Sequence, residues 1–255
     1  MNIAILTGAS AGLGKEYFRA ICAQHPEIDQ IWLIARREEA MREIAKECPE
    51  KSVRILPMDL TKKESYKELC ELLEQEKPTV TLLINNAGCG RLGNVIEERW
   101  EDQVRQTDLN VSALTAVTNI CLPYMPQKCG AGIIFVCSIA SFCPNPRMTV
   151  YSSTKAYVLS YAKGLSFELR GTGIHVLCVC PGPMHTEFLG VAGIGKGSSK
   201  TFDTLPYTRP DMVAQKSVRL VKKKSGIYTP RAFFKFYRIL AKFVPHGIMM
   251  HAAKT

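Results

Sequence analysis

The sequence predicts the α/β class, with one domain built on a doubly wound parallel sheet of about seven strands and helices on both faces. Short apolar runs alternate along the chain with longer helical patterns. Most of these runs do not alternate between apolar and polar residues, which indicates strands that are buried on both faces. A chain of 255 residues, of which 46% are apolar, suffices for one sizeable core.

The elements follow one another as strand, helix, strand, so the sheet should be parallel with right-handed crossovers. The segments that read as strands are residues 2–7, 30–35, 52–57, 80–85, 131–137, 174–180 and 226–229. The segments that read as helices are residues 12–24, 37–47, 62–76, roughly 97–122, 151–170 and 210–223. The stretch 184–209 is rich in Gly, Ser and Thr and lacks periodicity, so we expect a functional or mobile loop there.

The net charge of +10 is concentrated at one end of the chain. Residues 209–255 contain eleven Lys or Arg and one acid, whereas residues 1–208 contain 22 basic and 22 acidic side chains. No apolar run reaches the length of a membrane-spanning helix. The N-terminus enters an apolar run directly, without a basic region or cleavage site, so we expect a cytoplasmic protein.

Ten cysteines are spread singly through apolar segments, and none forms a C-x-x-C pair. We therefore expect reduced thiols that pack as small buried hydrophobes, and no metal site.

A glycine-rich turn follows the first predicted strand. Residues 7–14 read TGASAGLG and place Gly8, Gly12 and Gly14 between a strand and a helix. Glycine lets the backbone approach a pyrophosphate closely, and the N-terminus of the next helix offers free N–H groups. The spacing differs from the general G-x-G-x-x-G fingerprint, but its position predicts a Rossmann-type dinucleotide site.

The end of the second predicted strand indicates which nicotinamide cofactor is bound. An acid at this position would bind a ribose 2′-hydroxyl, but the chain has Arg36 and Arg37 there. Guanidinium groups pair with a 2′-phosphate, so we expect NADP(H), with Ser10 adding a hydroxyl. The alternative is that both arginines are solvated and pair with Glu38 or Glu39.

A tyrosine and a lysine stand one helical turn apart in YSSTK. Tyr151 and Lys155 would share a helix face, and a cation beside a phenol lowers the phenol pKa from its ordinary value of about 10. Tyr151 could then exchange a proton with a carbonyl or alcohol oxygen, and Lys155 could also hold the nicotinamide ribose. The spacing alone is common in helices. Ser138, at the end of the fifth predicted strand, strengthens the interpretation because its hydroxyl could bind the same substrate oxygen.

Over about residues 2–230 the sequence resembles the short-chain dehydrogenase/reductase family. The motifs that carry the resemblance are TGASAGLG, Asp59 in MDLT, NNAG at 85–88, Asn110 in DLNVSALT, Ser138 in FVCSIAS, Tyr151 with Lys155, and PGPMHT at 181–186. The resemblance implies a catalytic tetrad of Asn110, Ser138, Tyr151 and Lys155, in which Asn110 holds a water that leads to Lys155. From these motifs together, the expected cofactor-binding residues are Gly8, Ser10, Gly12, Leu13, Gly14, Arg36, Arg37, Asp59, Leu60, Asn86, Ala87, Gly88, Tyr151, Lys155, Pro181, Gly182 and Thr186.

The expected function is an NADP(H)-dependent oxidoreductase that reduces a ketone or aldehyde to an alcohol, or the reverse. Apolar residues in loop 184–209 and before Tyr151 suggest a lipophilic substrate, such as a steroid-like or fatty-acyl compound of lipid metabolism. These residues are Leu189, Val191, Ile194, Phe202 and Leu205 on one wall, and Cys143, Pro144, Pro146, Met148 and Val150 on the other. One alternative is a non-catalytic NADPH-binding sensor or scaffold. Another is a 3-oxoacyl-carrier-protein reductase.

Residues 231–255 are expected to form a basic amphipathic helix or tail attached to the catalytic domain of residues 1–230. Lys235, Arg238 and Lys242 would share one helix face. This tail could lie on a membrane surface, dock an acidic protein, or pack over the substrate pocket or in an interface between subunits. Nucleic acid is disfavoured because no recognition motif accompanies the charge. The family resemblance implies a homodimer or homotetramer.

Overall fold

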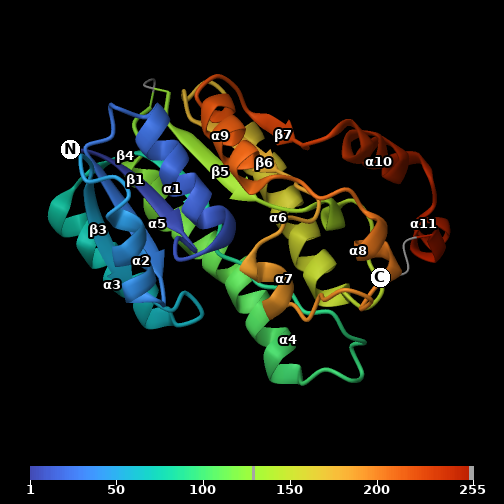
Figure 1. Cartoon of the computed structure of the whole chain (residues 1–255). Coiled ribbons are helices and arrows are strands. Elements are labelled where there is room, and N and C mark those ends of the chain that lie inside the picture. Colours follow the sequence, from blue (N-terminus) through green and yellow to red (C-terminus); the bar gives the residue numbers. More distant parts are fainter. Residues whose placement is uncertain (128–129, 253–255) are drawn as a thin grey trace.

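Seven parallel strands form one sheet in the order β3-β2-β1-β4-β5-β6-β7 (Figure 1). The computed structural model describes residues 1–127 and 130–252. The strands are β1 (Asn2–Thr7), β2 (Gln30–Ala35), β3 (Ser52–Pro57), β4 (Thr79–Asn85), β5 (Gly132–Val136), β6 (His175–Val179) and β7 (Gly226–Tyr228). This confirms the predicted α/β sheet. The strand order reverses between β1 and β4, the type of position at which such sheets bind ligands.

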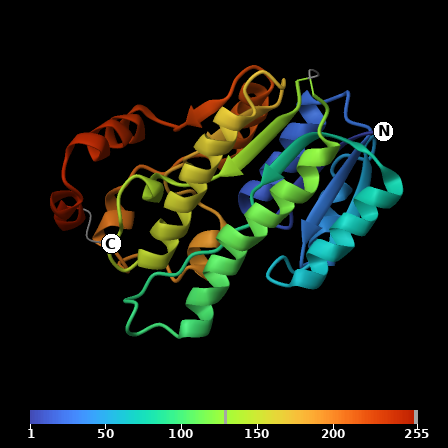
Figure 2. The same ribbon diagram turned by 180° about the vertical axis from the view of Figure 1, so that it is seen from behind.

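Helices cover both faces of the sheet. The first face is covered by α1 (Gly12–Gln24), α2 (Glu38–Ala45) and α9 (Pro210–Val221). The opposite face, which Figure 2 shows from behind, is covered by α3 (Lys63–Glu76), α5 (Leu114–Cys121) and α6 (Thr149–Glu168). Successive residues of a strand point to opposite faces, so Ile134 packs with the first helical layer and Phe135 with the second.

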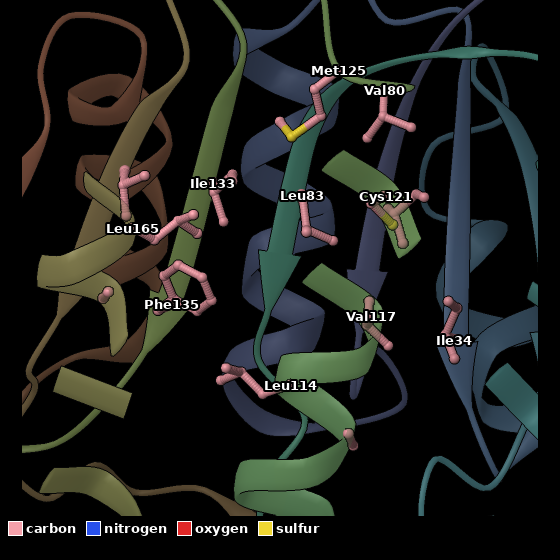
Figure 3. Packing of buried hydrophobic residues seen from close by; sticks show 14 of the residues in the cluster. Ile34, Val80, Leu83, Leu114, Val117, Cys121, Met125, Ile133, Phe135 and Leu165 are labelled. Carbon is pink, nitrogen blue, oxygen red and sulfur yellow. The ribbon is translucent and has the colours of Figure 1, made fainter. Parts of the chain in front are cut away.

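The core of the second layer is shown in Figure 3. Leu83 of β4 and Phe135 of β5 point from the sheet towards the helical layer that carries Leu114 and Val117. All four side chains are buried in one apolar cluster. The continuous apolar strands are therefore explained by two packed layers, one on each side of the sheet.

The long helix expected at 97–122 is divided by an irregular turn. It consists of α4 (Trp100–Thr107), the π-helical segment η1 (Asp108–Ala113), α5, and the 3-10 turn η2 (Leu122–Tyr124). A π-helical segment widens the helix by one residue per turn and is frequent at functional sites. Here it contains Asn110.

The last part of the chain lies beyond β7, at the edge of the sheet (Figures 1 and 2). It forms α10 (Ala232–Phe243) and α11 (His246–Ala252). The segment expected as a loop at 184–209 contains two short helices, α7 (Glu187–Val191) and α8 (Lys200–Thr204). Within the described residues, no helix is both long enough and apolar enough to cross a membrane.

Candidate active site

A cavity of about 940 Å³ opens at the carboxyl ends of the central strands. Every catalytic and cofactor-binding residue predicted from the sequence except Asn110 lines this cavity. Those lining residues are Gly8, Ser10, Gly12, Leu13, Gly14, Arg36, Arg37, Asp59, Leu60, Asn86, Ala87, Gly88, Ser138, Tyr151, Lys155, Pro181, Gly182 and Thr186. The fold therefore gathers motifs that are spread over most of the sequence into one site.

The glycine turn after β1 leaves no room for side chains. Gly8 has φ +67°, and a Cβ on it would lie 2.7 Å from Ala87 Cα. A Cβ on Gly14 would lie 2.1 Å from the Gly8 carbonyl oxygen. Both positions therefore require glycine, and the bare backbone at the start of α1 fits the diphosphate of a dinucleotide.

Two side chains lock the turn after β4 against this glycine turn. The Thr7 hydroxyl accepts hydrogen bonds from the backbone N–H groups of Asn86 and Ala87, both at 3.0 Å. The Asn86 amide donates to the carbonyl oxygens of Thr7 at 3.0 Å and Gly8 at 3.1 Å. Sequence reasoning did not single out Thr7, although it is the first residue of the TGASAGLG motif.

Arg36 and Arg37 both stand at the cavity wall after β2. Arg37 donates to Glu187 Oε2 at 2.9 Å and to Ser10 Oγ at 3.3 Å, so it ties α7 to the glycine turn. The alternative pairing of the arginines with Glu38 or Glu39 is not observed among the described residues: Glu38 pairs with Arg42, and Arg37 pairs with Glu187. A surface pair such as Arg37–Glu187 contributes little to stability, so a bound phosphate could replace it.

Asp59 keeps its charge at the cavity wall. Burial would raise the pKa of its carboxyl, but hydrogen bonds from Thr61 and the charges of Arg36 and Arg105 lower that pKa below its ordinary value. Thr61 donates to Asp59 Oδ1 from its hydroxyl at 2.8 Å and from its backbone N–H at 3.1 Å. Arg105 was missed by sequence reasoning, because an arginine on an exposed helix has no distinguishing pattern.

Tyr151, Lys155 and Ser138 meet on the same side of the cavity. Lys155 Nζ lies 5.7 Å from the centroid of the Tyr151 ring and donates to the Val136 carbonyl oxygen at 2.9 Å. Ser138 caps the 3-10 turn η3 (Ile139–Ser141), and its hydroxyl accepts from the Ala140 N–H at 3.1 Å. The helix α6 thus places the phenol and the ammonium on one face, as the spacing predicts.

Burial favours the neutral forms of both the Tyr151 phenol and the Lys155 amine. Desolvation raises the pKa of Tyr151 above its ordinary value, although its hydrogen bond with Ser138 acts in the opposite direction. Desolvation likewise lowers the pKa of Lys155. Burial is thus the largest cause of the raised Tyr151 pKa, and the expected lowering of the phenol pKa by Lys155 stays a prediction.

Asn110 lies directly behind the cavity wall, in the π-helical segment. Its Nδ2 donates to the Cys89 carbonyl oxygen at 2.8 Å and to Thr154 Oγ1 at 3.0 Å, and its Oδ1 accepts from the Cys89 N–H at 2.9 Å. A Cβ on Gly88 would contact Asn110 Oδ1 at 3.1 Å and Lys155 Nζ at 3.4 Å. Both Nδ2 protons are used, so a water held by this side chain would donate to the second lone pair of Oδ1.

The substrate side of the cavity differs in part from the expected walls. Leu189, Val191, Phe202 and Leu205 line it, as expected, together with Met148. The remaining expected residues, namely Cys143, Pro144, Pro146, Val150 and Ile194, are not among the lining residues. The opposite wall is instead supplied by the C-terminal helices, through Phe233, Phe234, Tyr237, Leu240 and Met249. Cys143 packs behind that wall, against Tyr237 and Met249.

Three cysteines lie together beneath the site. The Sγ atoms of Cys137, Cys178 and Cys180 all lie within 4.8 Å of one another, and all three residues are buried. Cysteines that are spread singly in the sequence come together here, because parallel register brings β5 and β6 side by side. The nine described cysteines are free thiols, and Cys129 lies outside the described residues.

The fold and the cavity define a nucleotide-binding oxidoreductase of the Rossmann type. The family model for short chain dehydrogenases matches residues 2–196, so the chain belongs to the short-chain dehydrogenase family. An uncharacterized oxidoreductase of Staphylococcus aureus (strain MRSA252) is 29% identical over 185 residues, which cover 72% of this chain and 79% of that protein.

Two solved structures share the fold. A short-chain dehydrogenase from Sphingobium yanoikuyae, in complex with NADPH, is 25% identical, with a TM-score of 0.82 and coverage of 98% of this chain and 95% of that chain. An alcohol dehydrogenase from Comamonas testosteroni, described as specific for bulky-bulky ketones, is 24% identical, with a TM-score of 0.76 and coverage of 98% and 94%. The second likeness concerns the fold alone. The chain is thus a short-chain dehydrogenase/reductase that uses a nicotinamide cofactor in carbonyl and alcohol interconversion.

Proposed function

We propose that the protein is an NADP(H)-dependent oxidoreductase that interconverts a lipophilic ketone or aldehyde and its alcohol. The observation that carries this proposal is one cavity shared by two groups of residues. Tyr151, Ser138 and Lys155 line it together with the glycine turn and the two arginines after β2. Proton-transfer groups and a dinucleotide cradle therefore face the same space.

The preference for NADP(H) over NAD(H) rests on charge. Arg36 is exposed at the cavity wall, Arg37 is exposed beside the Ser10 hydroxyl, and no acid stands at the end of β2. A ribose 2′-phosphate would gain charge-assisted hydrogen bonds from these groups. The solved relative from Sphingobium yanoikuyae binds NADPH, which supports the same choice.

The other residues of the proposed dinucleotide site each bind one part of the cofactor. The glycine turn would hold the diphosphate, Asp59 would face the adenine, and Lys155 would hold the nicotinamide ribose. The bound cofactor supplies the hydride that is added to, or taken from, the substrate carbon.

The protein's own chemistry is a proton transfer at the substrate oxygen. Ser138 donates a hydrogen bond to that oxygen and holds it beside the Tyr151 phenol. In reduction, Tyr151 donates its proton to the oxygen; in oxidation, the phenolate accepts the proton from the alcohol. The raised pKa of Tyr151 keeps the phenol protonated at neutral pH, which favours its role as the acid in reduction. Asn110 fixes the turn that carries Cys89 and so positions the floor of the site.

A lipophilic substrate fits the far end of the cavity. Its walls there are apolar, with Phe188 of α7 5.6 Å from the Tyr151 ring, measured between ring centroids, and Phe234 on α10. Burial of apolar substrate surface against such walls provides affinity without specific polar contacts. A steroid-like or fatty-acyl ketone has this character.

A panel of lipophilic ketones and aldehydes with NADPH or NADH tests the proposal. We expect absorbance loss of NADPH with at least one of them, and a higher kcat/KM with NADPH than with NADH. Tight NADPH binding without turnover over the whole panel would instead identify a sensor or scaffold. Turnover only of 3-oxoacyl groups on a carrier protein would identify the carrier-protein reductase.

A further inference from the structure

The helix α10 has one face turned to the domain and another left uncovered. Phe234 and Ala241 are buried, and the Phe234 ring occupies the space that a Cβ on Gly182 would need. On the opposite side, the exposed fractions of Phe236, Ile239 and Phe243 are 63%, 53% and 79%. These three outward residues follow a helical i, i+3, i+7 spacing, so they form one apolar stripe.

Positive charge accompanies the stripe. Lys235 and Lys242 are exposed on α10, one turn of the helix away from Ile239. No acidic residue follows Asp211 in the sequence, although eight Lys or Arg occupy residues 219–242, beginning with Arg219 and Lys222. An aromatic and aliphatic stripe flanked by lysines is the pattern of a helix that lies in the interface of an anionic membrane.

The same helices border the substrate end of the cavity. Tyr237 and Leu240 of α10 and Met249 of α11 line it, whereas Ile248 of α11 is 63% exposed on the outside. The outer stripe and the cavity wall are therefore two sides of one thin layer. If the outer face of α10 and α11 inserted into a membrane, the substrate end of the cavity would lie next to the acyl chains of the lipid.

We propose that α10 and α11 dock the protein on an anionic lipid surface, with Phe236, Ile239 and Phe243 inserted and Lys235 and Lys242 against the headgroups. The inserted residues form a continuous apolar stripe with the two cations along one edge, which fits a bilayer better than an acidic protein. The proposal goes beyond the catalytic function, and it can be tested without a substrate.

Vesicle flotation of the full chain tests the docking. We expect co-flotation with vesicles of phosphatidylglycerol and phosphatidylcholine, and at least tenfold weaker binding to phosphatidylcholine alone. Phe236→Ser with Phe243→Ser should lower binding to the anionic vesicles at least tenfold, and Lys235→Glu with Lys242→Glu should do the same. The matched control is Trp100→Ser with Phe167→Ser, which removes exposed aromatics outside α10 and α11 and should float as the parent does.

NADPH affinity, measured by fluorescence titration, shows that each variant remains folded. The proposal is overturned if the parent does not float with anionic vesicles, or if the Phe236 and Phe243 variant floats unchanged. It is also overturned if light scattering shows an oligomer for the parent and a monomer for the Phe236 and Phe243 variant. The stripe would then be an interface between copies of the chain.

A second, independent observation is the thiol cluster beneath the site. Cys178 Sγ and Cys180 Sγ lie 3.9 Å apart, and Cys137 Sγ lies within 4.8 Å of both. With metal–sulfur bonds of about 2.3 Å, a tetrahedral ion separates its sulfur ligands by about 3.8 Å. The Ser141 hydroxyl, which donates to the Ser138 carbonyl oxygen at 2.7 Å, also neighbours Cys137 and Cys180 and offers an oxygen as the fourth ligand.

Two cavities reach residues of this cluster. Cys137 lines the large cavity, and Cys178 and Ser141 line a second cavity of about 610 Å³. We infer that Cys137, Cys178, Cys180 and Ser141 form a site for one divalent thiophilic ion such as Zn²⁺ or Cd²⁺. On binding, three S–H bonds break, three metal–sulfur bonds form and three protons are released. Cys137 precedes Ser138, and its Sγ contacts the Lys155 carbonyl oxygen at 3.1 Å, so binding would also inhibit turnover.

Titration of the reduced protein with Cd²⁺ tests the site through the thiolate-to-cadmium absorption band. We expect a band that saturates at one ion per chain and is lost in both Cys178→Ala and Cys180→Ala. The controls are Cys121→Ala, a buried cysteine elsewhere, and Cys48→Ala, which removes the Cys22–Cys48 neighbours; both should keep the band. Absence of a band in the parent, or a band that survives both Cys178→Ala and Cys180→Ala, overturns the assignment.

Discussion

Cys89 and Asn110 are joined by two reciprocal hydrogen bonds. The Cys89 N–H donates to Asn110 Oδ1 at 2.9 Å, and Asn110 Nδ2 donates to the Cys89 carbonyl oxygen at 2.8 Å. The second proton of the same amide goes to Thr154 Oγ1, on the helix that carries Tyr151 and Lys155. One buried side chain therefore connects the loop after β4, the π-helical segment and α6.

Replacement of Asn110 by Ala should destabilise the protein. The change leaves the Cys89 backbone groups and the Thr154 hydroxyl without their buried partner, and one such loss costs about 1–3 kcal/mol. We expect a decrease of at least this size in the free energy of unfolding in urea. Asn119→Ala, which removes an exposed amide with two hydrogen bonds, is the control and should have a much smaller effect. Equal stabilities of the two variants would contradict the bridging role.

Gly14→Ala should weaken cofactor binding and stability together. A Cβ there would lie 2.1 Å from the Gly8 carbonyl oxygen, so the turn would have to move away from the diphosphate position. Gly164→Ala is a matched control, because a Cβ at that helical position meets nothing within 4 Å. The control should gain up to about 1 kcal/mol from helix propensity. NADPH titration and thermal unfolding distinguish Gly14→Ala from Gly164→Ala. An unchanged Kd for NADPH in Gly14→Ala would show that the glycine turn does not hold the diphosphate.

Arg36→Asp should shift the cofactor preference towards NADH. The variant loses a charge-assisted hydrogen bond of about 1.5–3 kcal/mol to the 2′-phosphate and adds repulsion, so kcat/KM with NADPH should fall by at least roughly tenfold. Arg42→Asp changes the same charge on α2, at a residue outside the cavity, and should leave the ratio of NADPH to NADH rates unaltered. If Arg36→Asp left the ratio unchanged, the phosphate assignment would be wrong.

The two reaction directions should depend differently on pH. Burial raises the pKa of Tyr151, so the protonated phenol that reduction requires persists across neutral pH. Oxidation requires the phenolate, and its kcat/KM should rise roughly tenfold per pH unit up to the raised pKa. Rates of both directions between neutral and alkaline pH check this. Tyr157→Phe, at an exposed tyrosine of the same helix, should keep both profiles, whereas a pH-independent oxidation rate would argue against a titrating phenol.

The sheet was predictable from the sequence because continuous apolar runs such as residues 30–35 have only one way to be buried on both faces. The site residues were predictable because parallel strands end at the same edge. Asn110 was expected within one long helix, and the π-helical form of that segment was not predicted. Packing of the C-terminal helices over the substrate pocket was one of the alternatives that the sequence left open, but Phe234 and Tyr237 were not identified as wall residues, because local sequence does not report tertiary packing. Likewise, the pKa of Tyr151 depends on burial, which the Tyr-Lys spacing does not encode.

The central claim is that the Tyr151 phenol transfers the proton at the substrate oxygen. Its most direct test is the turnover of Tyr151→Phe, which keeps the ring and removes only the hydroxyl. The account predicts that kcat falls by about 10²–10⁴-fold or more, since that is the usual contribution of a general acid, while the Kd for NADPH stays nearly the same. Turnover close to that of the parent, with the Kd unchanged, would show that another group donates the proton.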